Sequence, residues 1–260
     1  KGVLRPNAAA RDWFHYDFNY GNIGIFVMDI RSQRAVDAPN PLFGDLQFRD
    51  FRDFLRNNAT KKLLLIVTSV PVVHLAYWLA VVGVKIINPL LGLAGKDIDF
   101  PDHWSHTNNR PARDAFLSLL HAHQQAHPTQ RIAILSGDVH IGNAFGVRWK
   151  GGSSKTRLYQ FTSSPVSAQF AGIAAKITTL GPRWLSSISA RKTKFGPACE
   201  GDVHLLDGVA AATSNPLIGM NIGLIEVQRF GGESNLKFKL IGCHPDQHRP
   251  VTHFESGWLS

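Results

Sequence analysis

Three short, mostly apolar runs constrain the fold of this chain more than any other feature of its sequence. They occupy residues 23–29, 63–68 and 131–136, and each has the length of a buried β-strand. Between them, residues 45–58 and 111–127 place apolar side chains at helical spacing, which is typical of amphipathic helices. Strands that alternate with helices predict an α/β fold.

The second half of the chain predicts further strands. Residues 144–149 and 157–162 indicate one pair, and residues 222–229 and 236–243 indicate two closing strands. The intervening segment, from residue 164 to about 214, is rich in Ser and Ala, and we expect loop and helix there.

Composition narrows the class of protein. The chain has 260 residues, 44% of them hydrophobic, with 23 Gly and 14 Pro, which excludes collagen, coiled coils and wholesale disorder. No repeat or long linker is visible, so we expect residues 1–260 to form a single domain. The net charge of +9 attracts anions such as phosphorylated substrates. The basic residues form only short clusters, so we expect no specific nucleic-acid partner.

A long apolar stretch raises the question of membrane insertion. Residues 63–84 contain no Asp, Glu, Lys or Arg, but Ser69 and Pro71 interrupt them, so we predict a strand followed by an apolar helix or lid rather than a span. The segment 63–95 is a candidate for contact with a membrane or a protein partner. No signal-peptide pattern follows Lys1, and the compartment stays open.

The two cysteines carry little information. Cys199 and Cys243 are far apart and match no metal-binding spacing. We expect two buried thiols, and the redox compartment stays open.

The strongest candidate for chemistry follows the run 131–136. Gly137 permits a tight turn, and Asp138 and His140 are spaced so that both side chains can point into one crevice at the carboxyl end of a strand. A carboxylate and an imidazole are a normal ligand pair for Zn, Fe or Mn, although the pattern also fits a buried ion pair. Residues 201–204 repeat the sequence Gly-Asp-Val-His without an apolar run before it, so we predict a loop there.

Five segments in order resemble the motifs of PhoD-like (alkaline phosphatase D) metallophosphatases, within the calcineurin-like metallophosphoesterase superfamily. The resemblance is strongest over residues 23–230. The segments resemble a strand followed by D-x-R-x-x-R, a D-x-W element before a helix, the G-D-V-H metal motif, a T-S-S-x-x-S stretch and a closing strand. They are residues 26–34 (FVMDIRSQR), 102–105 (DHWS), 134–140 (ILSGDVH), 161–167 (FTSSPVS) and 221–227 (NIGLIEV).

The resemblance implies a metallophosphoesterase-type α/β/β/α sandwich with two divalent or trivalent metal ions (Fe, Zn, Mn or Ca). It implies hydrolysis of a phosphomonoester or phosphodiester by a metal-activated hydroxide. The family's early motifs, an Asp, a G-D-x-x-[YD] and a D-[DN]-H-[DE] block, are not found before Asp29. We therefore expect the C-terminal half of such a domain, whose partner is the N-terminal half that holds the first ligands. We therefore expect the phosphoesterase site to be incomplete in this chain alone.

The resemblance also assigns roles to metal-binding residues. It implies that His140 is a catalytic metal ligand and that Asp138 is a second ligand or the group that orients His140. His74, after the second strand, is a candidate additional ligand, or a packed histidine. His103 and His106 are candidates for substrate-side or structural positions.

Three further residues are candidates for substrate binding. Asn143 can hydrogen-bond a phosphoryl oxygen or cap a turn. Arg34 and Arg113 can meet phosphate, whereas an arginine next to Asp29 or Asp114 can equally form an internal ion pair.

Two other functions fit the same residues. The chain can be a non-catalytic remnant of this fold that binds phosphorylated ligands, a membrane or a partner. A serine hydrolase that uses Ser136 or Ser163 is a weaker alternative, because no G-x-S-x-G elbow is present.

Overall fold

The computed structural model describes residues 14–32, 42–73, 104, 107–137, 141–151, 155–163, 193–194, 200–209, 215–218, 220–230, 232–243 and 249–259. Within these ranges the chain forms a nine-stranded mixed sheet, a three-stranded antiparallel sheet and two α-helices. The predicted α/β fold is confirmed.

Four parallel strands form the centre of the large sheet. They are adjacent in the order β2 (Ile23–Val27), β3 (Leu63–Val67), β4 (Arg131–Ser136) and β6 (Leu158–Thr162). Both faces of these strands are covered, which explains why their sequences are nearly continuous apolar runs. Their register is aligned, so their carboxyl ends lie at one edge of the sheet.

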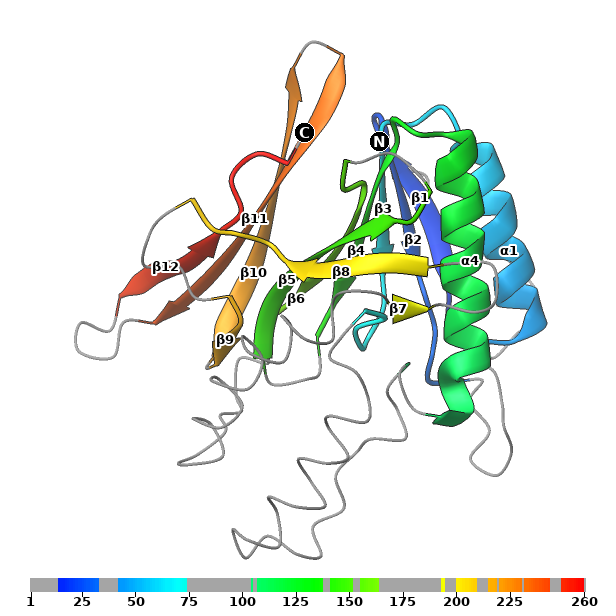
Figure 1. Ribbon diagram of the computed structural model, residues 1–260, viewed down its shortest axis with the longest axis horizontal. Coiled ribbons are helices and arrows are strands. Elements are labelled where there is room, and N and C mark those ends of the chain that lie inside the picture. The colour runs from blue at the N-terminus through cyan, green and yellow to red at the C-terminus, as the bar shows by residue number, and fades with distance from the viewer. Residues whose placement is uncertain are drawn as a thin grey trace, which may run out of the picture.

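Two helices cover one face of this sheet (Figure 1). Helix α1 (Asp45–Asn57) connects β2 to β3 and buries Phe51 and Phe54 against Phe26. Helix α4 (Arg110–Ala126) follows a 3-10 turn, η3 (Thr107–Asn109), has a proline in its first turn and precedes β4. Both helices were predicted from their apolar spacing, and both are confirmed.

The remaining strands extend the large sheet on both sides. Strand β5 (Ile141–Trp149) pairs antiparallel with β6, so the predicted strand pair is confirmed. The strand order is β1-β2-β3-β4-β6-β5-β8-β7, with β9 also on β5; the bounds not yet given are β1 (Tyr16–Tyr20), β7 (Thr193–Lys194), β8 (Glu200–Leu205) and β9 (Leu217–Ile218).

The expectation of loop and helix after residue 164 is wrong where β7 and β8 lie. In particular, the second Gly-Asp-Val-His copy is part of β8, not of a loop. Gly201 and Val203 are buried, whereas Asp202 and His204 alternate with them on the more open face. A half-buried strand needs only alternate apolar residues, so it shows no apolar run in the sequence.

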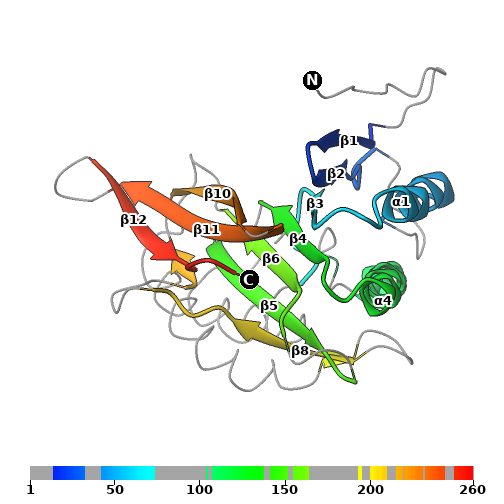
Figure 2. The same ribbon diagram turned by 90° about the horizontal axis from the view of Figure 1, so that it is seen from above.

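A second sheet packs on the other face of the large one (Figures 1 and 2). It consists of β10 (Asn221–Phe230), β11 (Glu233–Cys243) and β12 (Pro250–Glu255). The ring of Phe238 in β11 stacks on that of Phe161 in β6, with centroids 4.5 Å apart. Helices, large sheet and small sheet thus form three of the four layers of the expected sandwich, and the two predicted closing strands are confirmed.

The structure also bears on the expectations for the cysteines and for the apolar segment 63–95. Cys243, at the end of β11, is exposed, so the expectation of a buried thiol is wrong there, and Cys199 lies outside the described residues. Residues 63–73 belong to β3 and the mostly buried chain after it, while residues 74–95 lie outside the described ranges. Among the described helices, none is long and apolar enough to cross a membrane.

Candidate functional site

The carboxyl ends of the four parallel strands bring polar residues together. On the helix-facing side, β3 is followed by Thr68, and Ser136 and Thr162 end β4 and β6. Asn143, in β5, lies directly opposite Thr162. Below this polar row the same face of the sheet is apolar, with Phe26, Ile66 and Ile134 in the core. This is the edge at which α/β proteins place ligands.

Asp29, two residues beyond β2, organises the turn there. Its carboxylate accepts hydrogen bonds from the backbone N–H groups of Phe14 (3.1 Å), Arg31 (3.1 Å) and Ser32 (2.9 Å), and from the Ser32 hydroxyl. Burial raises the pKa of Asp29, but the hydrogen bonds together lower it by more, and the net effect is a pKa below the ordinary value.

The backbone of Asp29 is held as firmly as its side chain. Its N–H donates to Gln47 Oε1 (2.8 Å), and its carbonyl accepts from Gln47 Nε2 (2.7 Å), which ties this turn to the start of α1. Asp29 is therefore a structural carboxylate. Arg31 contributes its backbone N–H to it, and Arg34 lies outside the described residues.

Gln160 joins three segments beside this edge. Its side chain is fully buried in β6, and its Nε2 donates to Ser136 Oγ at 3.0 Å. Its Oε1 accepts the backbone N–H groups of Val72 (3.0 Å) and Val73 (3.3 Å). The chain that leads into residue 74 is thereby attached to the end of β4. Sequence reasoning missed Gln160, although a glutamine within the apolar run LYQFT is a visible signal.

Gly137 lies between the ends of the two strands that flank β4. Its N–H donates to the carbonyl of Ser69 at 3.2 Å, and a Cβ at this position would lie 3.6 Å from the carbonyl oxygen of Ser163. The residue before Asp138 therefore lies at the centre of the edge. Asp138 and His140 themselves lie outside the described residues.

Asn143 is the predicted site residue that the structure describes in most detail. It is 1% exposed, and its Oδ1 has no hydrogen-bond partner in the described part of the chain. The alternative that its side chain caps a turn is not what the structure shows, since Asn143 lies within β5.

Arg113 lies in the first turn of α4, which runs antiparallel to the strands and so begins at the carboxyl edge. Its Nη2 is 2.8 Å from Asp114 Oδ1, so the internal ion pair is formed. Trp104, just before η3, is fully buried against Phe43 and Phe116. His74, His103 and His106 lie outside the described residues.

The two candidate nucleophilic serines have structural contacts. Ser136 Oγ bonds with Thr162 Oγ1 (3.1 Å) as well as with Gln160. Ser163 Oγ donates to the carbonyl of Asn221 (3.2 Å) and accepts from Gly223 N–H (2.9 Å). Ser163 thus links the two sheets.

The described residues include several side chains beside the predicted metal site but none of its predicted ligands. Over the described ranges, no three His, Cys, Asp or Glu side chains gather closely enough to hold a metal ion. The predicted ligands Asp138, His140 and His74 are not among those residues. The feature at the edge that fits a cation is the unpaired, buried Oδ1 of Asn143, since amide oxygens are ligands for hard cations.

Comparisons with known proteins give limited information. No family model and no curated protein matches the chain. Among solved structures, one described as "Structure of PhoD" is similar, with a TM-score of 0.41 and 17% sequence identity. The match covers 58% of this chain and 28% of that one. The present chain thus spans well under half of that protein, and likeness at this level does not establish a family.

Proposed function

We propose that this chain forms part of a metal-dependent phosphoesterase site at the carboxyl edge of β2, β3, β4 and β6. The reaction is the hydrolysis of a phosphomonoester or phosphodiester. Asp138 and His140 follow β4 by two and four residues, and Gly137 is held between the ends of β3 and β6. The two candidate ligands therefore follow a residue at the centre of the edge that α/β proteins use for ligands.

The observation that carries the proposal is that the buried amide oxygen of Asn143 has no hydrogen-bond partner among the described residues. A buried acceptor without a partner costs about 1–3 kcal/mol, and a bound cation or a donor group offsets that cost. Asn143 lies three residues after His140 and opposite Thr162. Its Oδ1 can bind a cation, and its Nδ2 can donate to a phosphoryl oxygen.

The proposal also includes His74. The two residues that precede it, Val72 and Val73, donate their N–H groups to Gln160, whose Nε2 bonds to Ser136. Ser136 is two residues before Asp138. This connection supports a position for His74 near the same edge.

When bound, two cations would activate a water molecule and neutralise charge on the phosphoryl group. Asp138, His140 and His74 are the proposed metal-binding residues, and Asn143, Arg34 and Arg113 the proposed substrate-binding ones. The ion pair with Asp114 holds Arg113 at the start of α4 and neutralises part of its charge.

The duplicated tetrapeptide provides a control for the test. Hydrolysis of p-nitrophenyl phosphate and bis-p-nitrophenyl phosphate is measured with bound-metal analysis, on this chain and on the full-length gene product. We expect His140→Ala to lower both metal content and kcat/KM. The expected loss is about a hundredfold, or about 2.7 kcal/mol of transition-state stabilisation. Asp202→Asn alters the second copy, where Asp202 forms a half-exposed pair with Arg148, and should leave both unchanged.

Activity and metal content that survive His140→Ala would contradict the site. Equal losses in the Asp202→Asn variant would show that the effect is not specific to the copy after β4. No metal and no turnover in either wild-type protein would favour the non-catalytic, ligand-binding alternative.

A further inference from the structure

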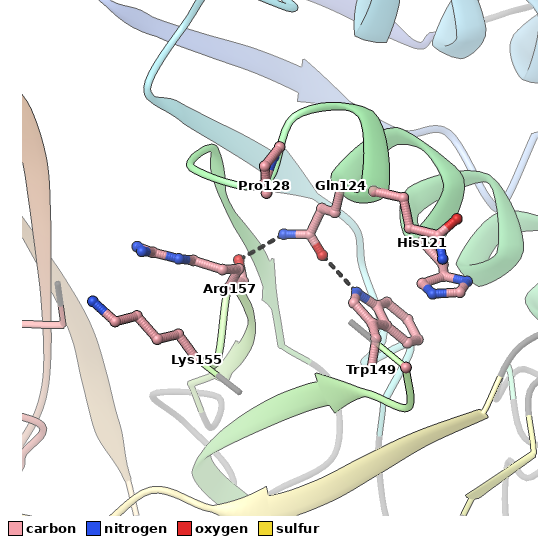
Figure 3. A pocket seen from close by; sticks show the side chains of 8 residues that line it. His121, Gln124, Pro128, Trp149, Lys155 and Arg157 are labelled. Carbon is pink, nitrogen blue, oxygen red and sulfur yellow. Dashed lines mark hydrogen bonds between the residues drawn. The ribbon is translucent and has the colours of Figure 1, made fainter. Parts of the chain in front are cut away.

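A pocket of about 340 Å³ lies at the edge of the large sheet opposite the candidate phosphoesterase site. It is formed where α4 ends and where β4 and β6 begin, so it is separated from the carboxyl edge by the length of the strands. Its walls include side chains from three segments, namely His121, Gln124, Pro128, Trp149, Lys155 and Arg157 (Figure 3).

Gln124 holds these segments in place. Its side chain is buried, its Nε2 donates to the carbonyl of Arg157 at 2.9 Å, and its Oε1 accepts the indole N–H of Trp149 at 2.7 Å. In Figure 3 it lies between Arg157 and Lys155 on one side and Trp149 and His121 on the other. The pocket is therefore built by tertiary contacts and is largely pre-formed.

The charge of the pocket is positive. Lys155 and Arg157 line it, and no carboxylate does so in the described part of the chain. The two residues are two positions apart just before β6, and their side chains extend to the same side (Figure 3). Nε and Nη1 of Arg157 are buried without a hydrogen-bond partner among the described residues. Because unpaired buried guanidinium N–H groups are costly, an anion is the ligand that they fit.

The opposite wall is flat and uncharged. The rings of His121 and Trp149 contact each other with centroids 4.9 Å apart, and Pro128 adds apolar surface. His121 is 9% exposed, and its Nε2 has no hydrogen-bond partner in the described part of the chain. Burial lowers the pKa of His121, which favours the neutral form of its ring.

We propose that this pocket binds a small organic anion. Its phosphoryl or carboxyl group pairs with Arg157 and Lys155, and its flat ring lies against Trp149. The inference is independent of the phosphoesterase site, since no residue is shared between the two.

The indole N–H of Trp149 reports on this pocket alone. Its NMR signal in nitrogen-15-labelled protein is identified by its loss in Trp149→Phe and is followed during titration with phenylphosphonate. We expect a saturable shift, and weaker binding of inorganic phosphate, which lacks the ring. Arg157→Gln should weaken phenylphosphonate binding by about tenfold or more, because a charge-assisted contact is lost. Lys155→Gln should act in the same direction, and Arg229→Gln, at an exposed position in β10, should have no effect.

The outcomes separate the parts of the proposal. No saturable shift, or one that is unchanged in both Arg157→Gln and Lys155→Gln, overturns the anion site. Equal affinity for phosphate and phenylphosphonate overturns the role of the ring. If Arg157→Gln does not fold by circular dichroism, Lys155→Gln decides, because Lys155 is exposed. Loss of hydrolysis in His140→Ala with an unchanged Trp149 response would show that the two sites are independent.

Discussion

Asp29 shows how a residue with the appearance of a functional group can be structural. It lies two residues beyond a buried strand, at the edge where catalytic carboxylates often lie. Its oxygens, however, accept three backbone N–H groups and one hydroxyl, and its own backbone is bound by Gln47. The carboxylate acts as a connector of the turn after β2.

Asp29→Asn should therefore lower stability in a pH-dependent way. Because the pKa of Asp29 is below its ordinary value in the folded protein, its charged form favours folding above about pH 4. That contribution is lost as the pH falls through the lowered pKa. We expect Asp29→Asn to reduce the free energy of unfolding by about 1–3 kcal/mol at pH 7, and by progressively less as the pH falls below about 4, measured by urea denaturation.

Asp53→Asn is the control, since Asp53 is half-exposed and pairs only with the exposed Arg56 in the contacts shown. Its effect should stay within about 0.5 kcal/mol. A pH-independent loss in Asp29→Asn would contradict a role for the carboxylate charge.

At the scale of elements, one charged contact joins the start of β4 to the start of β11. Arg131 is 2% exposed, and its Nη1 lies 3.0 Å from Glu233 Oε2 and donates to the carbonyl of Ser234 at 3.0 Å. Arginine at the first position of an apolar strand thus serves the packing of the two sheets.

Glu233→Gln should destabilise the protein by about 1–2 kcal/mol, because the buried guanidinium loses its charged partner but keeps the carbonyl. Arg131→Met removes the buried charge as well as the pair, and should cost less than Glu233→Gln. The free energies of unfolding of the two variants are compared directly. A smaller loss in Glu233→Gln than in Arg131→Met would be inconsistent with a buried charge that depends on its partner.

At the scale of the whole molecule, the contact between the two sheets determines whether they unfold together. Phe238 is 2% exposed and stacks on Phe161, with Phe254 beside it. Leu236 and Leu240 belong to the same cluster. The small sheet therefore depends on the large one for its buried face.

Phe238→Ala should reduce the free energy of unfolding by about 3–5 kcal/mol, because it leaves a cavity between the sheets. Tyr20→Ala, at a residue that is 70% exposed, serves as the control and should change the free energy of unfolding little.

If residues 1–260 form one domain, far-UV circular dichroism and tryptophan fluorescence should give coincident unfolding transitions in urea. Two separate transitions would indicate two units.

The sequence predicted the elements whose patterns are local. Residues 63–67 are all apolar because both faces of β3 are covered, and that burial can be predicted from the sequence alone. Strand β8 was not recognised, because its alternating burial leaves Asp202 and His204 between apolar residues. The polar row at the carboxyl edge was visible only as separate strand ends.

The sequence by itself determined the α/β class, the two helices, the apolar core strands and the candidate residues after β4, because each follows from the spacing of side chains along a short segment. Only the tertiary structure decided which of these segments meet. It made Asp29 a turn connector, placed Gln160 between Val72 and Ser136, and left the Asn143 amide oxygen unpaired. It also assembled a basic pocket from residues between positions 121 and 157. Contacts of this kind depend on strand register and layer packing, which bring together residues far apart in the chain.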